Sequence, residues 1–260
     1  MSEVPGEDFG FPTPHHRAAL DEVLAGLRAD ADVLGVLLCG SLARGTARED
    51  SDIDLLVVLA GGEGVTVGEA ARCSSRTRHG AIDVEQSCRT VAGWTAQFAP
   101  SRIGDESWGY AFLDGAVLHD LHGAVARLVD AAATAHARYR VPEHITAHYA
   151  WLWRHLRPKM EAVLRSADAT EVGWATAVMT KHLTNTLWAI NGRPLPSRDL
   201  GTFQRHLGDL TVPHNAPALI RELLAASPKD GLRLQLRLLN LVMPYLLNPR
   251  TREVSGSPEP

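Results

Sequence analysis

Two short segments in the first quarter of the chain combine residue types that have few chemical uses. Gly40 and Ser41 interrupt an apolar run, residues 33–38, that is suited to a buried strand. A serine at such a break can cap a short helix, and free backbone N–H groups at a helix start attract anions. Asp52 and Asp54 lie two apart at the start of a second apolar run, so their carboxylates point the same way in a strand. The two segments therefore predict a phosphate cradle beside a pair of metal-binding carboxylates.

The apolar pattern of the first half predicts the elements that would position these residues. Helical spacing indicates a helix over residues 15–27, with Pro14 suited to its first turn. Other helices are expected directly after Gly40 and over residues 89–99 and 123–133. Strands are predicted over residues 32–39, 52–59, 81–86 and 115–120. The first half therefore mixes strands with helices.

The pattern becomes almost entirely helical after Pro142. Apolar residues then recur every three or four positions, which predicts helices over residues 145–163, 172–187, 215–226 and 232–243. We expect Pro158 to kink or split the first of these helices and Pro244 to end the last. The predicted fold class is therefore α+β, with an N-terminal mixed sheet with helices followed by a C-terminal α-helical bundle.

This change of pattern also predicts the domain organisation. We expect a first domain over residues 1–137 and a helical domain over residues 138–247. Residues 248–260 are rich in proline, serine and charge, so they are predicted to form a disordered tail.

Composition narrows the range of partners and compartments. A length of 260 residues with 45% hydrophobic residues allows a sizeable core. The formal net charge of −4 argues against a long nucleic-acid track or an anionic membrane surface as partner. No apolar run approaches the roughly 20 residues that cross a bilayer. Cys39, Cys73 and Cys88 lack C-x-x-C spacing and are expected to be reduced thiols, and the acidic N-terminus lacks a signal-peptide pattern. A cytoplasmic protein is predicted.

The two opening segments together resemble a known signature. Gly40-Ser41, a ten-residue gap and the acid-apolar-acid segment 52–54 are similar to the motif of the polymerase-β-type nucleotidyltransferase superfamily. That resemblance implies a third acid on a later strand, and Asp83, flanked by apolar residues, takes that position. The mixed-then-helical layout is similar to the small-substrate, aminoglycoside- or antibiotic-type nucleotidyltransferases. The first domain would then be catalytic, and the helical domain would bind substrate.

The resemblance implies that Asp52, Asp54 and Asp83 are catalytic and bind metal. In such transfers two Mg²⁺ ions roughly 4 Å apart stabilise the entering and leaving oxygens. Asp52 and Asp54 would bridge the two ions. Asp83 would hold the catalytic ion near the acceptor hydroxyl and help to deprotonate that hydroxyl. Glu85 points the same way as Asp83 and is the alternative third ligand.

The nucleoside triphosphate would lie against the turn that precedes these acids. Gly40 would let the backbone approach the phosphates, and Ser41 would donate to a β- or γ-phosphate oxygen. Arg44 lies one turn further on and could add a charged fork, although an ion pair with Glu49 or Asp50 is an equal alternative.

Two further candidates lie outside the motif. In enzymes of the resembled family a basic residue of the helical domain often reaches the triphosphate, which makes Lys181 a candidate; a solvated helix lysine is the other interpretation. Glu106 could act as an extra base toward the acceptor, or it is an ordinary loop acid.

The resulting hypothesis is a Mg²⁺-dependent nucleotidyltransferase. It would transfer a nucleoside monophosphate, AMP from ATP, to a hydroxyl of a small molecule, with pyrophosphate as the other product. The resemblance suggests an aminoglycoside-like antibiotic as acceptor. One alternative is transfer to a protein or a tRNA, as in toxin–antitoxin nucleotidyltransferases, and another is a non-catalytic nucleotide-binding module. The net charge disfavours a nucleic-acid partner.

Overall fold

The computed structural model describes residues 9–61, 75–197 and 199–248. It divides into two compact units. Unit 1 consists of Met1–Pro100, Glu106–Arg138 and Pro196–Gln204, and unit 2 of Ser101–Asp105, Tyr139–Leu195 and Arg205–Pro260. The tail predicted over residues 248–260 lies outside the described residues except for Asn248.

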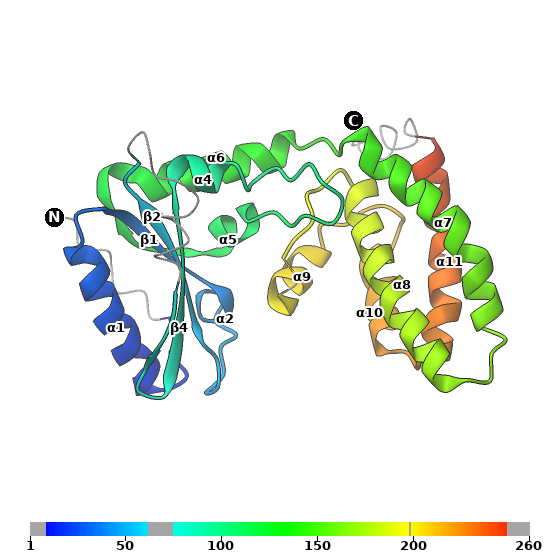
Figure 1. The fold of residues 1–260 in the computed structure, drawn as a ribbon, viewed down its shortest axis with the longest axis horizontal. Helices are drawn as coiled ribbons and strands as arrows, with labels where there is room; N and C mark the ends of the chain where they lie inside the picture. Colours follow the sequence, from blue (N-terminus) through cyan, green and yellow to red (C-terminus); the bar gives the residue numbers. More distant parts are fainter. Residues whose placement is uncertain (1–8, 62–74, 198, 249–260) are drawn as a thin grey trace, which may run out of the picture. The chain divides into compact units, whose positions relative to one another are not determined.

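Unit 1 is built on a mixed sheet whose described strands number five (Figure 1). The strands are β1 (Val33–Cys39), β2 (Ile53–Leu59), β3 (Ser75–His79), β4 (Ile82–Thr90) and β5 (Ala116–Asp120). Their order across the sheet is β3-β4-β2-β1-β5. Strands β2 and β4 are parallel, whereas the other neighbouring pairs are antiparallel. This arrangement confirms the predicted mixed sheet.

Different helices cover the two faces of this sheet. The helices of unit 1 are α1 (Pro14–Ala29), α2 (Gly40–Ala43), α4 (Val91–Thr95), α5 (Gly109–Asp114), the 3-10 turn η1 (Leu121–Gly123) and α6 (Ala124–Arg138), and α9 (Leu200–Leu207) begins in it. Leu20 and Leu24 of α1 pack on one face, against strand residues such as Ile53. Trp94, Phe98, Phe112 and Leu128 pack on the other face, against strand residues such as Leu56. Because side chains alternate along a strand, Asp54 shares the second face with Leu56.

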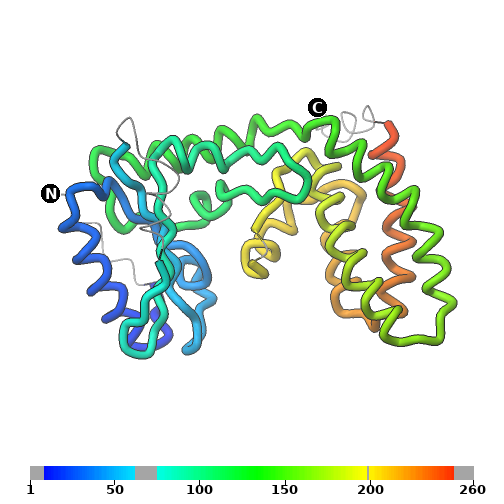
Figure 2. Tube along the Cα trace, viewed as in Figure 1, coloured from blue at the N-terminus to red at the C-terminus, as the bar shows by residue number. Residues whose placement is uncertain are grey.

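Unit 2 is a bundle of helices, which confirms the predicted C-terminal helical character. Its helices are α7 (Glu143–Val163), α8 (Ala169–Ile190), α10 (Ala216–Ala225) and α11 (Pro228–Leu247). Helix α11 contacts α7, α8 and α10, and α7 contacts α8 (Figure 2). Asp168 caps α8 by accepting hydrogen bonds from the backbone N–H groups of Thr170 and Glu171.

Two prolines do not end their helices. Helix α7 continues through Pro158, so the split that was one of the two expected outcomes is wrong, while the kink stays a prediction. Helix α11 runs past Pro244 to Leu247, so the predicted end at Pro244 is wrong. Proline removes one backbone hydrogen bond from a helix interior. In both helices buried residues follow the proline, Met160 in α7 and Leu246 in α11, so packing keeps the chain helical beyond it.

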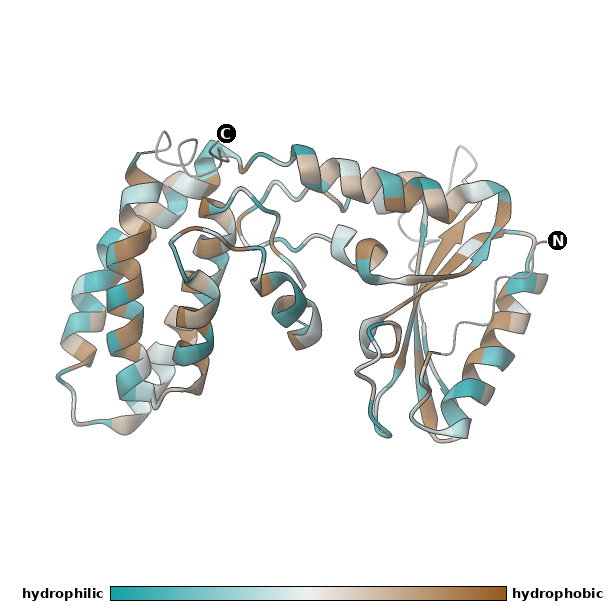
Figure 3. Cartoon of the chain, turned by 180° about the vertical axis from the view of Figure 1, so that it is seen from behind, coloured by the Kyte–Doolittle hydropathy of each residue, from teal (hydrophilic) through white to brown (hydrophobic). Residues whose placement is uncertain are grey.

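Several features were not predicted from the sequence. Strand β3 and helices α5 and α9 were missed, and β3 is a polar edge strand without an apolar pattern. The apolar strands β1 and β2, in contrast, stand out in the hydropathy colouring of Figure 3. Cys39 is a buried free thiol as expected, but Cys88 is disulfide-bonded, which contradicts its prediction as a reduced thiol. Across the described ranges, no helix is long and apolar enough to span a bilayer.

Candidate functional site

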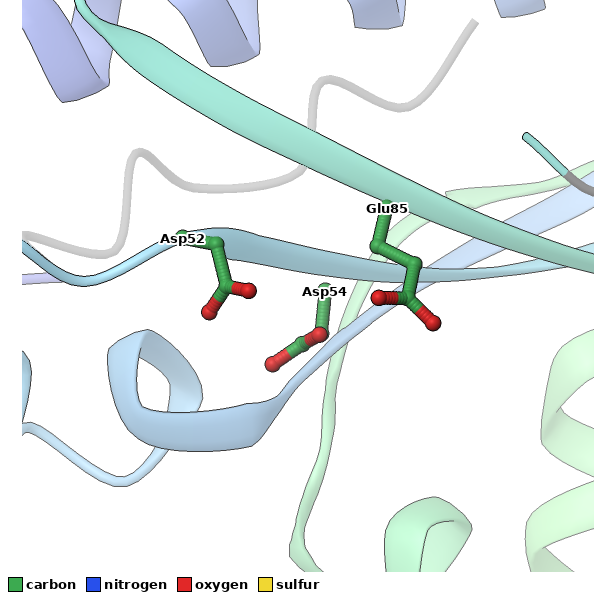
Figure 4. A group of neighbouring side chains, drawn as sticks. All are labelled: Asp52, Asp54 and Glu85. Atoms are coloured by element: carbon green, nitrogen blue, oxygen red, sulfur yellow. The ribbon is translucent and has the colours of Figure 1, made fainter. Parts of the chain in front are cut away.

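Three carboxylates meet at one end of β2. One oxygen from each of Asp52, Asp54 and Glu85 lies within 4.8 Å of the others (Figure 4). Asp54 belongs to β2, Asp52 directly precedes that strand, and Glu85 belongs to the parallel strand β4. The strand register pairs Asp54 with Glu85, so both side chains emerge from the same face of the sheet.

The third member of this group is Glu85, the alternative ligand, and not Asp83. The Asp83 carboxylate instead contacts two arginines of β3, at 3.2 Å from Arg76 and 3.3 Å from Arg78. Asp83 and Glu85 point the same way along β4, so the acid pattern alone fits both. The parallel register and the arginines of the unpredicted strand β3 distinguish them. The structure therefore groups Glu85, and not Asp83, with Asp52 and Asp54, while the catalytic role of Asp83 stays a prediction that no observation tests.

The electrostatics of Asp54 favour a bound cation. Burial raises the pKa of Asp54 to about 6, and the nearby charges of Asp52, Glu85 and Asp199 add to that rise, whereas Arg44 opposes it. Three converging carboxylates repel one another when ionised, and a cation between them relieves that repulsion. Oxygen donors of this kind suit Mg²⁺, which is bound through a few carboxylates and keeps several waters. The donor set therefore fits a divalent metal centre.

The turn after β1 approaches these carboxylates closely. Gly40 has a φ of +70°, and a Cβ at that position would overlap the Asp54 carboxylate. Both the backbone conformation and the space therefore require glycine. Ser41 is the second residue of α2, and Cys39, not Ser41, occupies the N-cap, where no side-chain hydrogen bond caps the helix. The predicted capping role of Ser41 is wrong, while its contact with phosphate stays a prediction.

Arg44 is held in the protein and not in solvent. Its side chain is 8% exposed, its Nη2 lies 2.7 Å from Asp199 Oδ2, and its Nη1 donates to Thr202 Oγ1 at 3.2 Å. Asp199 also accepts hydrogen bonds from the backbone and hydroxyl of Thr202. Burial would raise the pKa of Asp199, but the hydrogen bonds from Thr202 and the charge of Arg44 outweigh it and leave that pKa lowered. Arg44 thus pairs with Asp199 and not with Glu49 or Asp50.

A pocket of about 240 Å³ lies against this group within unit 1. Its lining includes several acids, which are Asp54, Glu85, Glu106, Asp114 and Asp199. Arg44 is the one arginine or lysine among the described lining residues, and it is already paired with Asp199. Trp108 and Ala111 provide apolar wall, and Glu106, proposed from sequence as an extra base, shares the pocket with Asp54. The pocket is therefore strongly acidic beside the candidate metal centre.

Lys181 belongs to unit 2, on α8. It lines a separate hollow of about 550 Å³ together with His148, His182 and Asn185. Burial lowers the pKa of His182, and the charges of Lys181 and His148 contribute. Acids are absent from the described lining of this hollow. The positive charge of Lys181 and the lack of acids among the described lining residues suit an anionic group. The contact of Lys181 with a triphosphate stays a prediction.

Sequence reasoning missed several residues of the site. Asp199 and Thr202 lie in a segment that returns to unit 1 after most of unit 2 has been traversed, which no local pattern reveals. Asp199 directly precedes the apolar Leu200, and an N-cap residue type in that position is a helix-start signal that could have located α9. Arg76 and Arg78 alternate like a strand, which could have indicated pairing with the acids of β4.

Comparison with known proteins agrees with this site. Residues 20–87 match the family model described as "Nucleotidyltransferase domain". The match covers the turn at Gly40 and all three carboxylates, although it spans less than half of the chain. No curated protein matches the chain. Among solved structures, a nucleotidyltransferase-like protein from Exiguobacterium sibiricum aligns with 13% identity and a TM-score of 0.39, covering 93% of this chain and 76% of that one. A likeness this weak carries no argument about function.

Proposed function

We propose that this protein is a divalent-metal-dependent nucleotidyltransferase that transfers a nucleoside monophosphate to a hydroxyl of a small molecule. The carboxylate group of Asp52, Asp54 and Glu85 beside Gly40 carries this proposal. The match of residues 20–87 to a nucleotidyltransferase domain supports it independently of the geometry. ATP is the proposed donor, with AMP as the transferred group, and Mg²⁺ is the proposed metal, as two ions.

In this proposal the three carboxylates hold the metal. Divalent ions, when bound, would neutralise charge that develops on the phosphoryl oxygens and the leaving pyrophosphate. Gly40 has no side chain between its backbone and the Asp54 carboxylate, so a phosphate could approach the backbone at this turn. In this proposal Arg44 supports the pocket through its pair with Asp199, and the charged fork toward the phosphates that the sequence suggested for it stays a prediction.

The reaction forms one bond and breaks one bond. The acceptor oxygen bonds to the α-phosphorus, the bond from that phosphorus to the bridging oxygen breaks, and pyrophosphate leaves with the electron pair. The proton of the acceptor hydroxyl passes to a carboxylate. We assign this role to Glu106, because it lines the same pocket as Asp54 and Glu85, whereas Asp83 pairs with Arg76 and Arg78.

The proposed acceptor is a small cationic molecule. An acidic pocket favours a ligand with ammonium groups, and Glu106 and Asp114 line the pocket beyond the metal-holding acids and the Arg44–Asp199 pair. An amine-rich aminoglycoside combines such groups with many hydroxyls and fits this description, as the sequence resemblance suggests. A net charge of −4 disfavours tRNA as acceptor.

The helical region is proposed to contribute to substrate binding. In this interpretation residues 1–137 form the catalytic domain and residues 138–247 the substrate-binding domain. Lys181 would contact the triphosphate, and the hollow that it lines on α8, without acids among its described residues, supports that assignment.

One assay tests the proposal. The protein is incubated with Mg²⁺ and each labelled nucleoside triphosphate, alone and with aminoglycosides, tRNA or cell lysate. Pyrophosphate release that depends on an aminoglycoside is the expected result, and it should be abolished by Asp54→Asn and reduced about a hundredfold by Glu106→Gln. Label transfer to RNA or protein would overturn the small-molecule acceptor. Nucleotide binding without turnover under all conditions would overturn the enzymatic assignment.

A further inference from the structure

Arg76 lies directly against the candidate metal centre. It belongs to the edge strand β3, where the antiparallel register places it opposite Glu85. Its Nη2 lies 3.5 Å from Asp52 Oδ2 and 3.2 Å from Asp83 Oδ2, and its Nη1 lies 3.8 Å from Glu85 Oε2. The guanidinium therefore contacts two of the three carboxylates that would hold a metal.

We propose that Arg76 is an exchangeable counter-cation of this centre, which neutralises Asp52 and Glu85 in the metal-free protein and releases them when a divalent cation binds. This inference rests on the proposed function, because it takes the three carboxylates to be the metal ligands. It adds a residue that sets the affinity of the site without being a ligand itself.

The contacts of Arg76 with Asp52 and Glu85 are of a kind that a metal ion can replace. Its side chain is 57% exposed, and its distances to Asp52 and Glu85 exceed the range of a good hydrogen bond. Ion pairs of exposed residues contribute little to stability, so a doubly charged cation can replace them. The pair of Arg44 with Asp199 differs in both respects, at 2.7 Å with Arg44 8% exposed, and is expected to persist.

Asp83 provides the position to which Arg76 can withdraw. It lies 3.2 Å from Arg76 and outside the group of three carboxylates. Metal binding to Asp52 and Glu85 therefore leaves Arg76 with one anionic partner. This arrangement also gives Asp83 a function on β4 without making it a ligand.

Arg78 offers a matched control on the same strand. It carries the same charge and is 66% exposed, and it forms an ion pair with Asp83 at 3.3 Å. The register places it opposite Asp83 and two residues further from Glu85. Removing either arginine changes the net charge of the protein equally, so a difference between the two variants reports contact with the metal ligands and not the general field.

The experiment measures Mn²⁺ binding to the full-length protein in the absence of nucleotide, by electron paramagnetic resonance of free Mn²⁺. We expect Arg76→Gln to bind Mn²⁺ about three- to tenfold more tightly than the wild type, with the gain diminishing at high salt. Arg78→Gln should remain within about twofold of the wild type. Circular dichroism of each variant confirms that the fold is retained.

The possible results test the exchange of Arg76 and the metal centre separately. The proposal that Arg76 is exchanged would be overturned if Arg76→Gln bound Mn²⁺ with the affinity of the wild type. It would also be overturned if Arg76→Gln and Arg78→Gln gained Mn²⁺ affinity equally. Weaker binding by Arg76→Gln would also overturn it, because Arg76 would then organise the carboxylates. Asp54→Asn separates this inference from the proposed function. If that variant binds Mn²⁺ as the wild type does, the metal centre itself is wrong, whatever the arginine variants show.

Discussion

At the scale of single residues, the site depends on which carboxylates share one point in space. Asp52, Asp54 and Glu85 converge, while the charge of Asp83 is already matched by two arginines. A carboxylate that is paired with two arginines and lies outside the group is a weaker candidate ligand than Asp52 or Glu85, whose contacts with Arg76 are longer. The consequences of this difference can be measured separately for binding and for turnover.

The first prediction compares Glu85→Gln with Asp83→Asn. Both substitutions neutralise one carboxylate on the same face of β4. Glu85→Gln removes a proposed metal ligand and is expected to lower kcat/KM about a hundredfold or more and to weaken Mg²⁺ binding. Asp83→Asn should lower kcat/KM by less than about tenfold, because its carboxylate is not in the group. Steady-state kinetics across Mg²⁺ concentrations measure both, and a larger loss in Asp83→Asn would restore Asp83 as the third ligand.

The second prediction concerns the pH dependence of stability through Asp54. Its pKa rises from 3.8 to about 6 in the folded protein, so the folded state binds this proton more tightly than the unfolded state. Metal-free stability is therefore lost as pH rises from about 4 to about 6, and the loss remains above that range. Asp54→Asn cannot ionise, so without metal it should be more stable than the wild type at pH 7.5, by about 2 kcal/mol.

Urea unfolding in the presence of a chelator, at pH 4 and at pH 7.5, measures this difference. The stabilisation by Asp54→Asn should disappear at pH 4, where both proteins are neutral at this position. Saturating Mg²⁺ should reverse the order at pH 7.5, because it binds the folded wild type. Asp50→Asn, in an exposed position of the preceding loop, serves as the control. An unchanged difference at both pH values would contradict the ionisation argument.

At the scale of elements, the parallel pair β2 and β4 positions the acids, and the segment around α9 closes the pocket. The apolar runs of β1 and β2 and the alternation of apolar with acidic residues in β4 made these strands predictable, because strands follow hydrophobic patterns. Strand β3 could not be predicted in the same way, since its residues are polar and lie at the sheet edge. The choice between Asp83 and Glu85 depended on the register with β2 and on β3, so the sequence left that part of the site open.

The third prediction tests how α9 is attached to the site. A Cβ at Gly201 would lie 2.5 Å from Arg44 Nη2 and 2.6 Å from Arg44 Nε. Arg44 cannot move aside freely, because its side chain is buried and paired with Asp199. Gly201→Ala is therefore expected to disrupt that pair and to destabilise the protein by about 1–3 kcal/mol.

Thermal unfolding of Gly201→Ala should show a lower midpoint than the wild type, together with reduced turnover. Gly208→Ala is the matched control, because a Cβ at Gly208 would meet no atom within 4 Å. Equal midpoints for the two variants would show that Arg44 accommodates the added methyl group and that its packing on Gly201 is not a constraint.

At the scale of the whole molecule, the candidate metal-binding carboxylates and Lys181 belong to different compact units. The helical character of the second half was predictable from its three-four spacing. The return of residues 196–204 to unit 1 was not, since the packing of a segment so distant in sequence leaves no local pattern. The candidate metal centre thus lies in unit 1, and any role of unit 2 in the proposed reaction depends on whether its residues bind substrate.

The last prediction asks whether both units act on one nucleotide. If Lys181 contacts the triphosphate, Lys181→Ala should raise the KM for ATP by about tenfold or more, because a charge-assisted contact to phosphate is lost. Mn²⁺ binding without nucleotide should be unchanged, since the three carboxylates lie in unit 1. Lys159→Ala on α7 removes an equal charge from an exposed helix position and should leave the KM unaltered. A wild-type KM in Lys181→Ala would assign the hollow on α8 to some other anion and confine nucleotide binding to unit 1.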